Sequence, residues 1–285
     1  MSRPEGMSIC VGVDAGASLA KIARREPDGS LSFRLEPGHA LERVAAWVAG
    51  AGAARVGLTG CGAGALGAQL GSGRGREPVG VNEFAAWGRG AAELLTAHGG
   101  PRGERLLLVS LGTGTSVMLA DELAVNRVGG TALGGGTLVG LGAALLGTDD
   151  FEEIAGLAER GSRHTVDLLV RDIYRPGEIA LAGEITAANF GKLARLPDGE
   201  TPEREDVAHA LMGLVGENVA LICAGLVAAH QVRRLVFGGA TLRKNPSLVS
   251  ILQGITTALG AEVTFLPDGE FAGALGALLL AEASL

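Results

Sequence analysis

The chain contains 285 residues, 47% of them hydrophobic and 19% charged, and carries a formal net charge of −7. This length is sufficient for one large domain or for two domains of ordinary size. The acidic balance without a long basic run argues against a nucleic-acid partner, because such partners require a positively charged surface. No unbroken apolar run approaches the roughly 18 residues needed to cross a bilayer, so we expect a soluble protein with no membrane partner.

The numbers and positions of the cysteines and lysines give information about cellular compartment and about candidate functional residues. Cys10, Cys61 and Cys223 are odd in number and far apart, which fits neither a disulfide framework nor a paired zinc site. No secretion signal is recognisable near the first residue, so a cytoplasmic protein with reduced thiols is expected. Only three of the 24 basic residues are lysines, at positions 21, 192 and 244. A lysine retained in such a chain suggests a need for its compact point charge.

Apolar periodicity and glycine or proline punctuation predict alternating strands and helices. In the first part of the chain, the predicted elements are a buried strand at 9–13, a hairpin at 20–36 that turns at 27–29, a helix at 40–52, a strand at 54–60, a helix at 83–98 and a strand at 105–112. A hairpin at 115–130, with its turn near Asp121, follows. We place a domain boundary at this turn, with an N-terminal domain at 1–120 and a C-terminal domain at 121–285.

The C-terminal part is expected to contain more helix. The first predicted helix starts at Gly135, and three more cover 151–159, 165–173 and 202–229. They are followed by a strand at 233–239, a helix at 246–259, a strand at 261–266 and a helix at 271–283. Each half therefore combines strands, helices and glycine-rich turns, which favours an α/β protein.

Four glycine-rich turns follow predicted strands: "DAGAS" (14–18), "LTGCGAG" (58–64), "SLGTGTS" (110–116) and "FGGAT" (237–241). Such turns leave backbone N–H groups free to face an anion, and four of them favour phosphate binding over plain connections. The chain has no GxxxxGK[ST] motif, which disfavours a Walker-type ATPase. "DAGASLAK" opens a hairpin rather than a helix, which disfavours a dinucleotide fold.

The first turn carries three polar side chains suited to a nucleotide phosphate. This turn resembles the phosphate-1 turn of the sugar kinase, actin and heat-shock ATPase superfamily. The resemblance implies that Asp14 orients Mg²⁺ through water, that Ser18 and nearby N–H groups hold phosphate oxygens, and that Lys21 offers charge to a transferring phosphoryl group. The simpler alternative is that Asp14 only forms the turn and Lys21 is a solvated strand residue.

Glu83 lies where a kinase of the same superfamily has its general base, so the resemblance makes it the candidate for that role. It follows Asn82 in "VNEFAA", at the predicted start of a helix, where an acid also simply favours the positive end of the helix dipole. A positioned carboxylate that accepts a proton from an attacking hydroxyl typically accelerates the reaction 10²- to 10⁴-fold. Arg127, in "NRVGG", could bind a substrate carboxylate or stabilise phosphoryl charge, or it could be an ordinary edge-strand charge.

Taken together, these motifs resemble one family, the type II pantothenate kinases. The segments that carry the resemblance occur in the order "GVDAGASLAKI", "LTGCGAG", "VNEFAA", "SLGTGTS", "RVGGTALGGGTLVGLGAALLG", "RGSRHTVDLLVRDIY", "EITAANFGKL" and "GEFAGALGALLL". They extend from about residue 9 to residue 280. The resemblance implies an actin-like ATPase (ribonuclease H-like) duplication, with two mixed-sheet domains and a nucleotide cleft between them.

The resemblance also implies a reaction and its participants. ATP, with Mg²⁺, would phosphorylate pantothenate to 4'-phosphopantothenate, the first step of coenzyme A biosynthesis. Glu83 would be the general base, assisted by Arg127, and Thr113, Ser116 and Arg127 would contact the substrate. The nucleotide contacts implied are Asp14, Ala15, Gly16, Ala17, Ser18, Leu19, Ala20, Lys21, Thr113, Gly135, Gly136, Thr137, Leu138, Val139, Phe151 and Gly239. A homodimer is implied, with the 202–229 helix in its interface, and a coenzyme A thioester is a candidate inhibitor.

Two departures from the family pattern affect the phosphate turns. The usual "DAGGT" is "DAGAS" here, so Ala17 adds a Cβ where glycine permits the closest approach. "TGG" has become "TGC", which puts Cys61 in a glycine turn. Two other functions remain open: a sugar kinase of the same fold acting on N-acetylglucosamine or glucose, and a non-catalytic ATP-binding regulator. Glu83 and the lack of a cysteine-rich zinc motif count against them.

Overall fold

Two five-stranded mixed sheets with the same topology form the framework of the protein. A computed structural model describes residues 9–71, 77–121, 124–197 and 199–284. The first sheet contains β1 (Cys10–Ala15), β2 (Leu19–Arg25), β3 (Leu31–Pro37), β4 (Arg55–Thr59) and β5 (Val79–Gly80), in the order β3-β2-β1-β4-β5. The second contains β6 (Leu106–Leu111), β7 (Thr115–Ala120), β8 (Val125–Thr131), β11 (Arg234–Gly238) and β12 (Glu262–Phe265), in the order β12-β11-β6-β7-β8. In both, three antiparallel strands continue into two parallel ones, as expected for a duplication.

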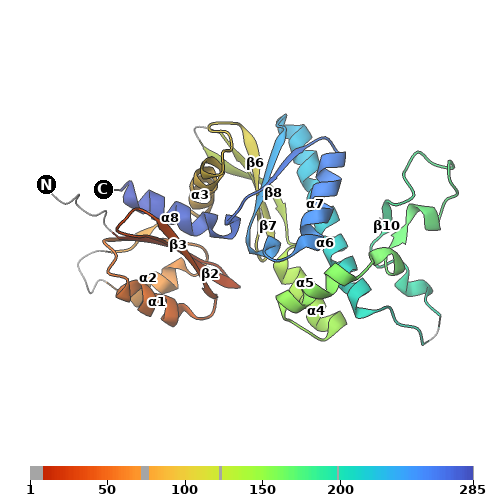
Figure 1. The fold of residues 1–285 in the computed structure, drawn as a ribbon, viewed down its shortest axis with the longest axis horizontal. Helices are drawn as coiled ribbons and strands as arrows, with labels where there is room; N and C mark the ends of the chain where they lie inside the picture. Colours follow the sequence, from red (N-terminus) through yellow and green to blue (C-terminus); the bar gives the residue numbers. More distant parts are fainter. Residues whose placement is uncertain (1–8, 72–76, 122–123, 198, 285) are drawn as a thin grey trace.

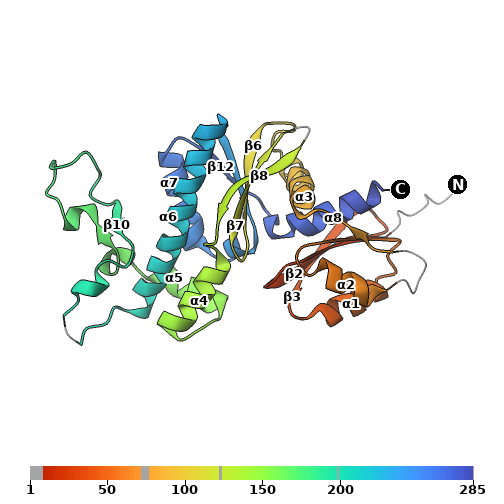
Figure 2. The same cartoon turned by 180° about the vertical axis from the view of Figure 1, so that it is seen from behind.

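The helices cover the faces of these sheets (Figure 1). They are α1 (Leu41–Gly50), α2 (Ala63–Leu70), α3 (Glu83–Ala97), α4 (Gly135–Leu146), α5 (Phe151–Arg160), α6 (Arg204–His230), α7 (Pro246–Ala258) and α8 (Ala272–Glu282). Helices α1 and α2 pack on the first sheet, and α4 to α7 lie on the side of the second sheet remote from it. A segment with the short strands β9 (Leu168–Leu169) and β10 (Thr186–Ala188) projects from the body beyond α6 (Figure 2).

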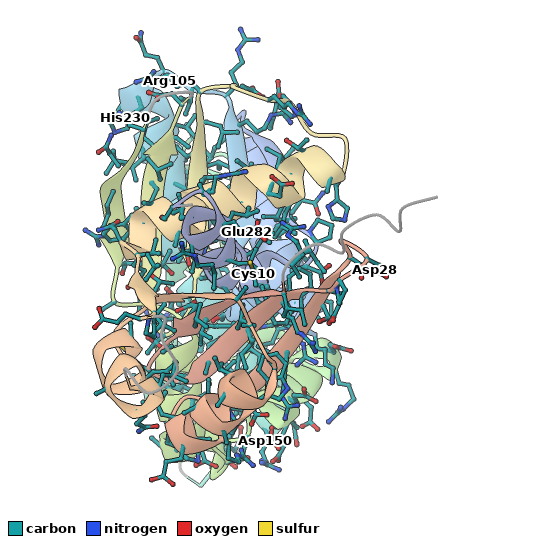
Figure 3. All side chains as sticks on the ribbon, turned by 90° about the vertical axis from the view of Figure 1, so that its left-hand side faces the viewer. Cys10, Asp28, Arg105, Asp150, His230 and Glu282 are labelled. Carbon is teal, nitrogen blue, oxygen red and sulfur yellow. The ribbon has the colours of Figure 1, made fainter. Side chains whose placement is uncertain are left out.

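Helices α3 and α8 lie between the two sheets and connect them. Their backbones touch: a Cβ on Gly276 of α8 would lie 1.6 Å from the carbonyl oxygen of Ala86 in α3, so only glycine allows this approach. The apolar cluster around them draws residues from both sheets, including Cys10 of β1 and Leu108 of β6. At the C-terminal end of α8, the Glu282 Oε1 lies 2.7 Å from the Arg25 Nε of β2, and this ion pair connects the helix to the first sheet. Cys10 lies close to Glu282 (Figure 3).

Helix α6 forms the core of the second half. By length and composition it could cross a membrane, but half of its apolar window is buried inside the protein. Leu211, Met212 and Val215 are buried against the second sheet and the neighbouring helices. These residues make α6 the central helix of this half of the protein.

Most predicted elements are confirmed, but the helix expected at 165–173 is wrong. That stretch forms two 3₁₀ turns and β9, which pairs with β10 in antiparallel fashion. The buried Asp167 accepts a hydrogen bond from the Phe190 N–H (2.8 Å), so contacts distant in sequence override the local helical pattern.

The domain boundary expected between residues 120 and 121 also needs correction. It would separate β7 from β8, which pair with each other, whereas the sheets divide between β5 and β6. Helix α8 then returns from the second half to pack on β1 and β4. The first structural unit is therefore completed by the C-terminal helix. The outer limits of the two predicted domains, residues 1–8 and 285, lie outside the described residues.

Candidate active site

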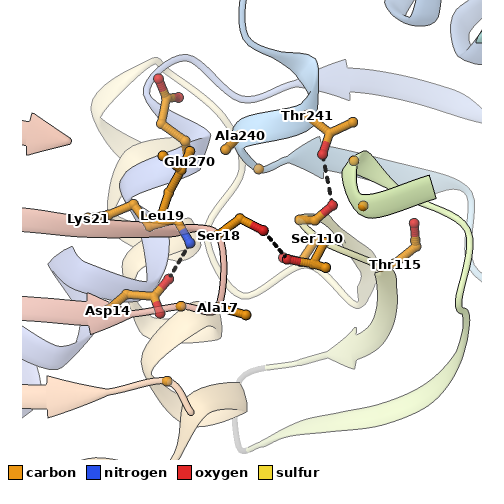
Figure 4. A pocket seen from close by; sticks show the side chains of 18 of the residues that line it. Asp14, Ala17, Ser18, Leu19, Lys21, Ser110, Thr115, Ala240, Thr241 and Glu270 are labelled. Carbon is orange, nitrogen blue, oxygen red and sulfur yellow. Dashed lines mark hydrogen bonds and ion pairs between the residues drawn. The ribbon is translucent and has the colours of Figure 1, made fainter. Parts of the chain in front are cut away.

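A cavity of about 1110 Å³ lies between the two halves, and both contribute to its walls. The first half supplies the β1–β2 turn and the start of α3, and the second supplies the β6–β7 turn, the starts of α4 and α5, and the segment after β11 (Figure 4). The predicted site residues that line it are Asp14, Gly16, Ala17, Ser18, Leu19, Lys21, Glu83, Thr113, Ser116, Arg127, Gly135, Gly136, Val139, Phe151 and Gly239. Gly60 and Cys61 line it as well, so residues from all four glycine-rich turns meet at one cavity.

Asp14 and Lys21 form an ion pair on the floor of this cavity. They are direct partners in the β1–β2 ladder, and the Lys21 Nζ lies 3.2 Å from the Asp14 Oδ2. Each side chain is only 14% exposed. The start of α8 abuts the same carboxylate, since a Cβ on Gly273 would lie 3.0 Å from Oδ2. Lys21 is therefore not a solvated strand residue; it neutralises a largely buried carboxylate and offers the same charge to the cavity.

Glu83 is the first residue of α3. Asn82 caps this helix by accepting a hydrogen bond from the Ala85 N–H (3.1 Å), which fixes the position of Glu83 at the cavity edge. The surrounding protein removes part of the hydration of its carboxylate, although the cavity leaves it accessible. This desolvation raises the pKa of Glu83, the Asp14 charge raises it further, and Lys21 opposes both by lowering it.

The two halves touch through hydroxyl groups at the phosphate turns. The Ser18 Oγ lies 2.9 Å from the Thr113 Oγ1, so the β1–β2 turn and the β6–β7 turn are joined across the cavity (Figure 4). The Thr241 hydroxyl donates to the Gly112 carbonyl oxygen (2.8 Å) and connects the segment after β11 to the same turn. Three of the four glycine-rich turns thus hold one another in place.

The N–H groups at the start of α4 hold the neighbouring β6–β7 turn. The Gly135 N–H donates to the Gly112 carbonyl oxygen (2.8 Å), and the Gly136 N–H donates to the Thr113 carbonyl oxygen (2.9 Å). Both donors are therefore engaged in holding the β6–β7 turn and do not point freely at a phosphate. Thr137 acts within the helix cap, where its hydroxyl donates to the Ala132 carbonyl oxygen (3.2 Å).

Four of the predicted nucleotide contacts do not line the cavity. Ala15, Ala20 and Leu138 are fully buried core residues, and Thr137 caps α4. In the β1–β2 hairpin the alternation of side chains directs Ala15 and Ala20 into the core while Asp14 and Lys21 face the cavity. Assignment of every residue of 14–21 to the nucleotide ignores this alternation of side chains.

The far end of the cavity is lined by an aromatic ring and several charges. Phe151 begins α5, whose N-terminus is capped by Asp150 through a hydrogen bond from the Glu152 N–H (2.8 Å). Arg243 lies 3.5 Å from Glu152 and 3.8 Å from Glu270. Glu270 and Arg243 were not expected from the sequence, because the connections that carry them approach the site only in the folded chain.

Two further lining residues had a detectable sequence signal. Ser110 pairs with Ser116 across β6 and β7, and both face the cavity. A polar residue that interrupts the apolar run "LLLVSL" at the end of a buried strand marks such a position. Trp87 lies one helical turn after Glu83 and also lines the cavity.

The two departures from the family pattern are accommodated without strain. Among the non-glycine residues described, a positive φ occurs at Phe190, Gln231, Lys244 and Asp268, so Ala17 has an ordinary backbone conformation. Its side chain is exposed at the cavity surface. Cys61 is an exposed, free thiol in the cavity wall.

Solved structures with the same fold include two that were determined with nucleotide analogues. The activator of the 2-hydroxyisocaproyl-CoA dehydratase from Clostridium difficile, with bound ADPNP, has a TM-score of 0.62 at 18% identity, covering 97% of this chain and 95% of that one. A ROK family glucokinase from Streptomyces griseus, in complex with glucose and AMPPNP, has a TM-score of 0.59 at 16% identity, covering 96% and 99%. These likenesses confirm the expected fold, an actin-like ATPase duplication.

Sequence comparison extends the likeness to a family. The Fumble family model matches residues 104–280. The type II pantothenate kinase of Staphylococcus epidermidis (strain ATCC 35984) is 32% identical over 270 residues, which cover 95% of this chain and 99% of the relative. That of Staphylococcus aureus (strain USA300) is 31% identical over 271 residues, covering 95% and 98%. On these matches, the chain belongs to the type II pantothenate kinase family.

Proposed function

We propose that this protein transfers the γ-phosphoryl group of ATP to pantothenate, giving ADP and 4'-phosphopantothenate in the first step of coenzyme A biosynthesis. The observation that carries the proposal is the convergence of Glu83, the Asp14–Lys21 pair and Arg127 on one cavity between two actin-like halves, in a member of this family. The cavity is large enough for a nucleotide and a small acid together.

Glu83 is the proposed general base. The primary hydroxyl of pantothenate loses its proton as it attacks the γ-phosphorus, and the Glu83 carboxylate accepts that proton. The raised pKa of Glu83 makes its carboxylate a better proton acceptor. Lys21 is proposed to stabilise the charge on the transferring phosphoryl group, because its positively charged side chain lines the same cavity.

Arg127 is proposed to bind the carboxylate of pantothenate. A guanidinium and a carboxylate form two parallel charge-assisted hydrogen bonds, which fix the orientation of the acid as well as its position. Ser116 and Thr113 line the same cavity as Arg127 and offer hydroxyl groups to the rest of the substrate. Positioning of this kind is the main contribution that a protein makes to phosphoryl transfer.

The nucleotide is proposed to lie along the turns. Residues 16–19 would follow the phosphates, Gly239 would lie beside them on the other half, and Phe151 with Val139 would form the apolar end for adenine.

Mg²⁺ is the proposed metal, held through water by Asp14. Among the residues that the structure describes, no three His, Cys, Asp or Glu side chains are grouped to hold a metal by themselves. This fits Mg²⁺, which is usually bound by one or two carboxylates, water and substrate phosphates. When bound, it would neutralise charge on the phosphate oxygens of ATP.

A turnover assay tests the function. Purified protein with ATP and Mg²⁺ should release ADP with pantothenate, and not with N-acetylglucosamine or glucose. Glu83→Gln should lower kcat by about 10²- to 10⁴-fold while retaining ATP binding. Glu93→Gln, on the exposed face of the same helix, is the matched control and should retain activity. Turnover of a sugar in place of pantothenate would refute the proposed substrate, and ATP binding without any turnover would favour a regulator.

We also propose a homodimer that uses α6. Leu221 is 57% exposed, and Gly225 and Ala228 are exposed beside it at helical spacing, giving an apolar stripe on this helix.

A coenzyme A thioester contains both an adenine nucleotide and a pantothenoyl group, so it is proposed to compete with the substrates at the cavity between the two halves. The three free cysteines suit a cytoplasmic enzyme.

A further inference from the structure

Strand β8 contains a one-residue bulge directly beside the proposed substrate site. In the β7–β8 ladder, Val117 is opposite Gly129, but the next residue, Met118, is opposite Arg127. Val128 is therefore the extra residue on β8. Side chains alternate between the two faces of a regular strand, so without a bulge Arg127 and Gly129 would share a face.

The neighbours of β8 show that the bulge separates these two residues. Gly129 faces α6, since a Cβ there would lie 2.7 Å from the Leu226 Cδ1. Val125 faces the opposite side, where it packs against Gly88 of α3. Arg127 lies on the side of Val125 and lines the cavity. Bulges next to active sites commonly redirect a side chain in this way.

Gly130 completes the arrangement. Its φ of +149° is strained for any residue with a side chain, and a Cβ would lie 2.4 Å from the Thr115 carbonyl oxygen and 2.7 Å from the Arg127 Nη2. The guanidinium of Arg127 thus occupies the space that a side chain at position 130 would take. We propose that Gly130 is a positioning residue: together with the bulge at Val128 it forms the pocket that holds the Arg127 guanidinium for the carboxylate of the substrate. This inference rests on the proposed function of Arg127.

Neighbouring glycines provide a matched pair of variants. Gly130→Ala should raise the KM for pantothenate by about 10- to 100-fold, because loss of a hydrogen bond to a charged group has an effect of this size. The KM for ATP should change by less than about twofold. Gly129→Ala should retain the kinetics of the wild type, because its Cβ meets only the flexible end of Leu226. In an Arg127→Ala background, Gly130→Ala should add less than about threefold, since the two changes remove one interaction.

A second variant keeps the proposal testable if Gly130→Ala does not fold. Arg127→Ala removes an exposed side chain and leaves the pocket at Gly130 intact. Millimolar guanidinium should then restore pantothenate turnover at least about tenfold, whereas methylammonium should not, because guanidinium reproduces the planar group that lies beside Gly130 in the wild type.

The outcomes separate this inference from the function on which it rests. Absence of pantothenate turnover by the wild-type protein would refute the proposed function. With normal wild-type turnover, three results would each overturn the role of Gly130 alone: an unchanged KM for pantothenate in Gly130→Ala, losses that multiply in the double variant, or no rescue of Arg127→Ala by guanidinium.

Discussion

Replacement of Lys21 by Met should destabilise the protein as well as impair catalysis. Lys21 is the ion-pair partner of Asp14 at 3.2 Å, and both side chains are 14% exposed. The substitution leaves a largely buried carboxylate without its counter-charge, and an unsatisfied buried polar group costs about 1–3 kcal/mol. At about 2–4 °C for each kcal/mol in chains of this size, Tm should fall by about 2–12 °C.

Thermal and urea unfolding of the nucleotide-free protein provide the assay. Lys244→Met is the matched control, because Lys244 also pairs with a carboxylate, Glu152, at 3.0 Å, but both side chains are more than half exposed. An exposed pair of this kind contributes about 0–1 kcal/mol. The double variant Asp14→Asn/Lys21→Met should regain part of the stability lost in Lys21→Met, since no buried charge is then left unpaired.

The reasoning fails if Lys21→Met is no less stable than Lys244→Met. Asp14 would then be satisfied by its other neighbours, such as the start of α8 near Gly273, and the ion pair would contribute only to phosphoryl transfer. It also fails if the double variant is less stable than Lys21→Met.

Four further predictions concern the site and the elements that support it. The pKa of Glu83 is higher in the folded than in the unfolded protein, so the stability that this residue contributes is present below the unfolded pKa and is lost as pH rises through the folded pKa. Glu83→Gln, which cannot ionise, should therefore have a higher Tm than the wild type at neutral pH. Below about pH 4 the two proteins should have the same Tm. Because Lys21 lowers the pKa of Glu83, Lys21→Met should shift the acid limb of the kcat/KM profile to higher pH, and an unshifted limb would contradict this. Gly276→Ala should destabilise by about 1–3 kcal/mol or more through overpacking, whereas Gly254→Ala in open space on α7 should be neutral or stabilising in the same urea titration. Leu221→Asp should convert the proposed dimer to a monomer in light scattering, and an unchanged mass would place the interface elsewhere.

Local sequence patterns determined most helices and strands of this protein and the polar residues that flank its turns. The alternation in "VGVDAGASLAKIA" is sufficient to predict two strands that pair, and the pairing then places Asp14 opposite Lys21. Asn82 before Glu83 predicts the start of α3, because a capping side chain acts within a few residues. Such patterns involve residues close together in the sequence, so they can be interpreted without knowledge of the rest of the fold.

Only the tertiary structure decided which neighbours these groups meet. Residues 165–173 look helical locally, but pairing with β10 and the buried Asp167 impose a different conformation. The N–H groups of Gly135 and Gly136 donate hydrogen bonds to carbonyl oxygens of the β6–β7 turn, which lies more than 20 residues earlier in the chain. The bulge that turns Arg127 toward the cavity depends on how β8 fits between α3 and α6. In each case the deciding contact joins segments distant in sequence, and no local pattern records which of them will meet.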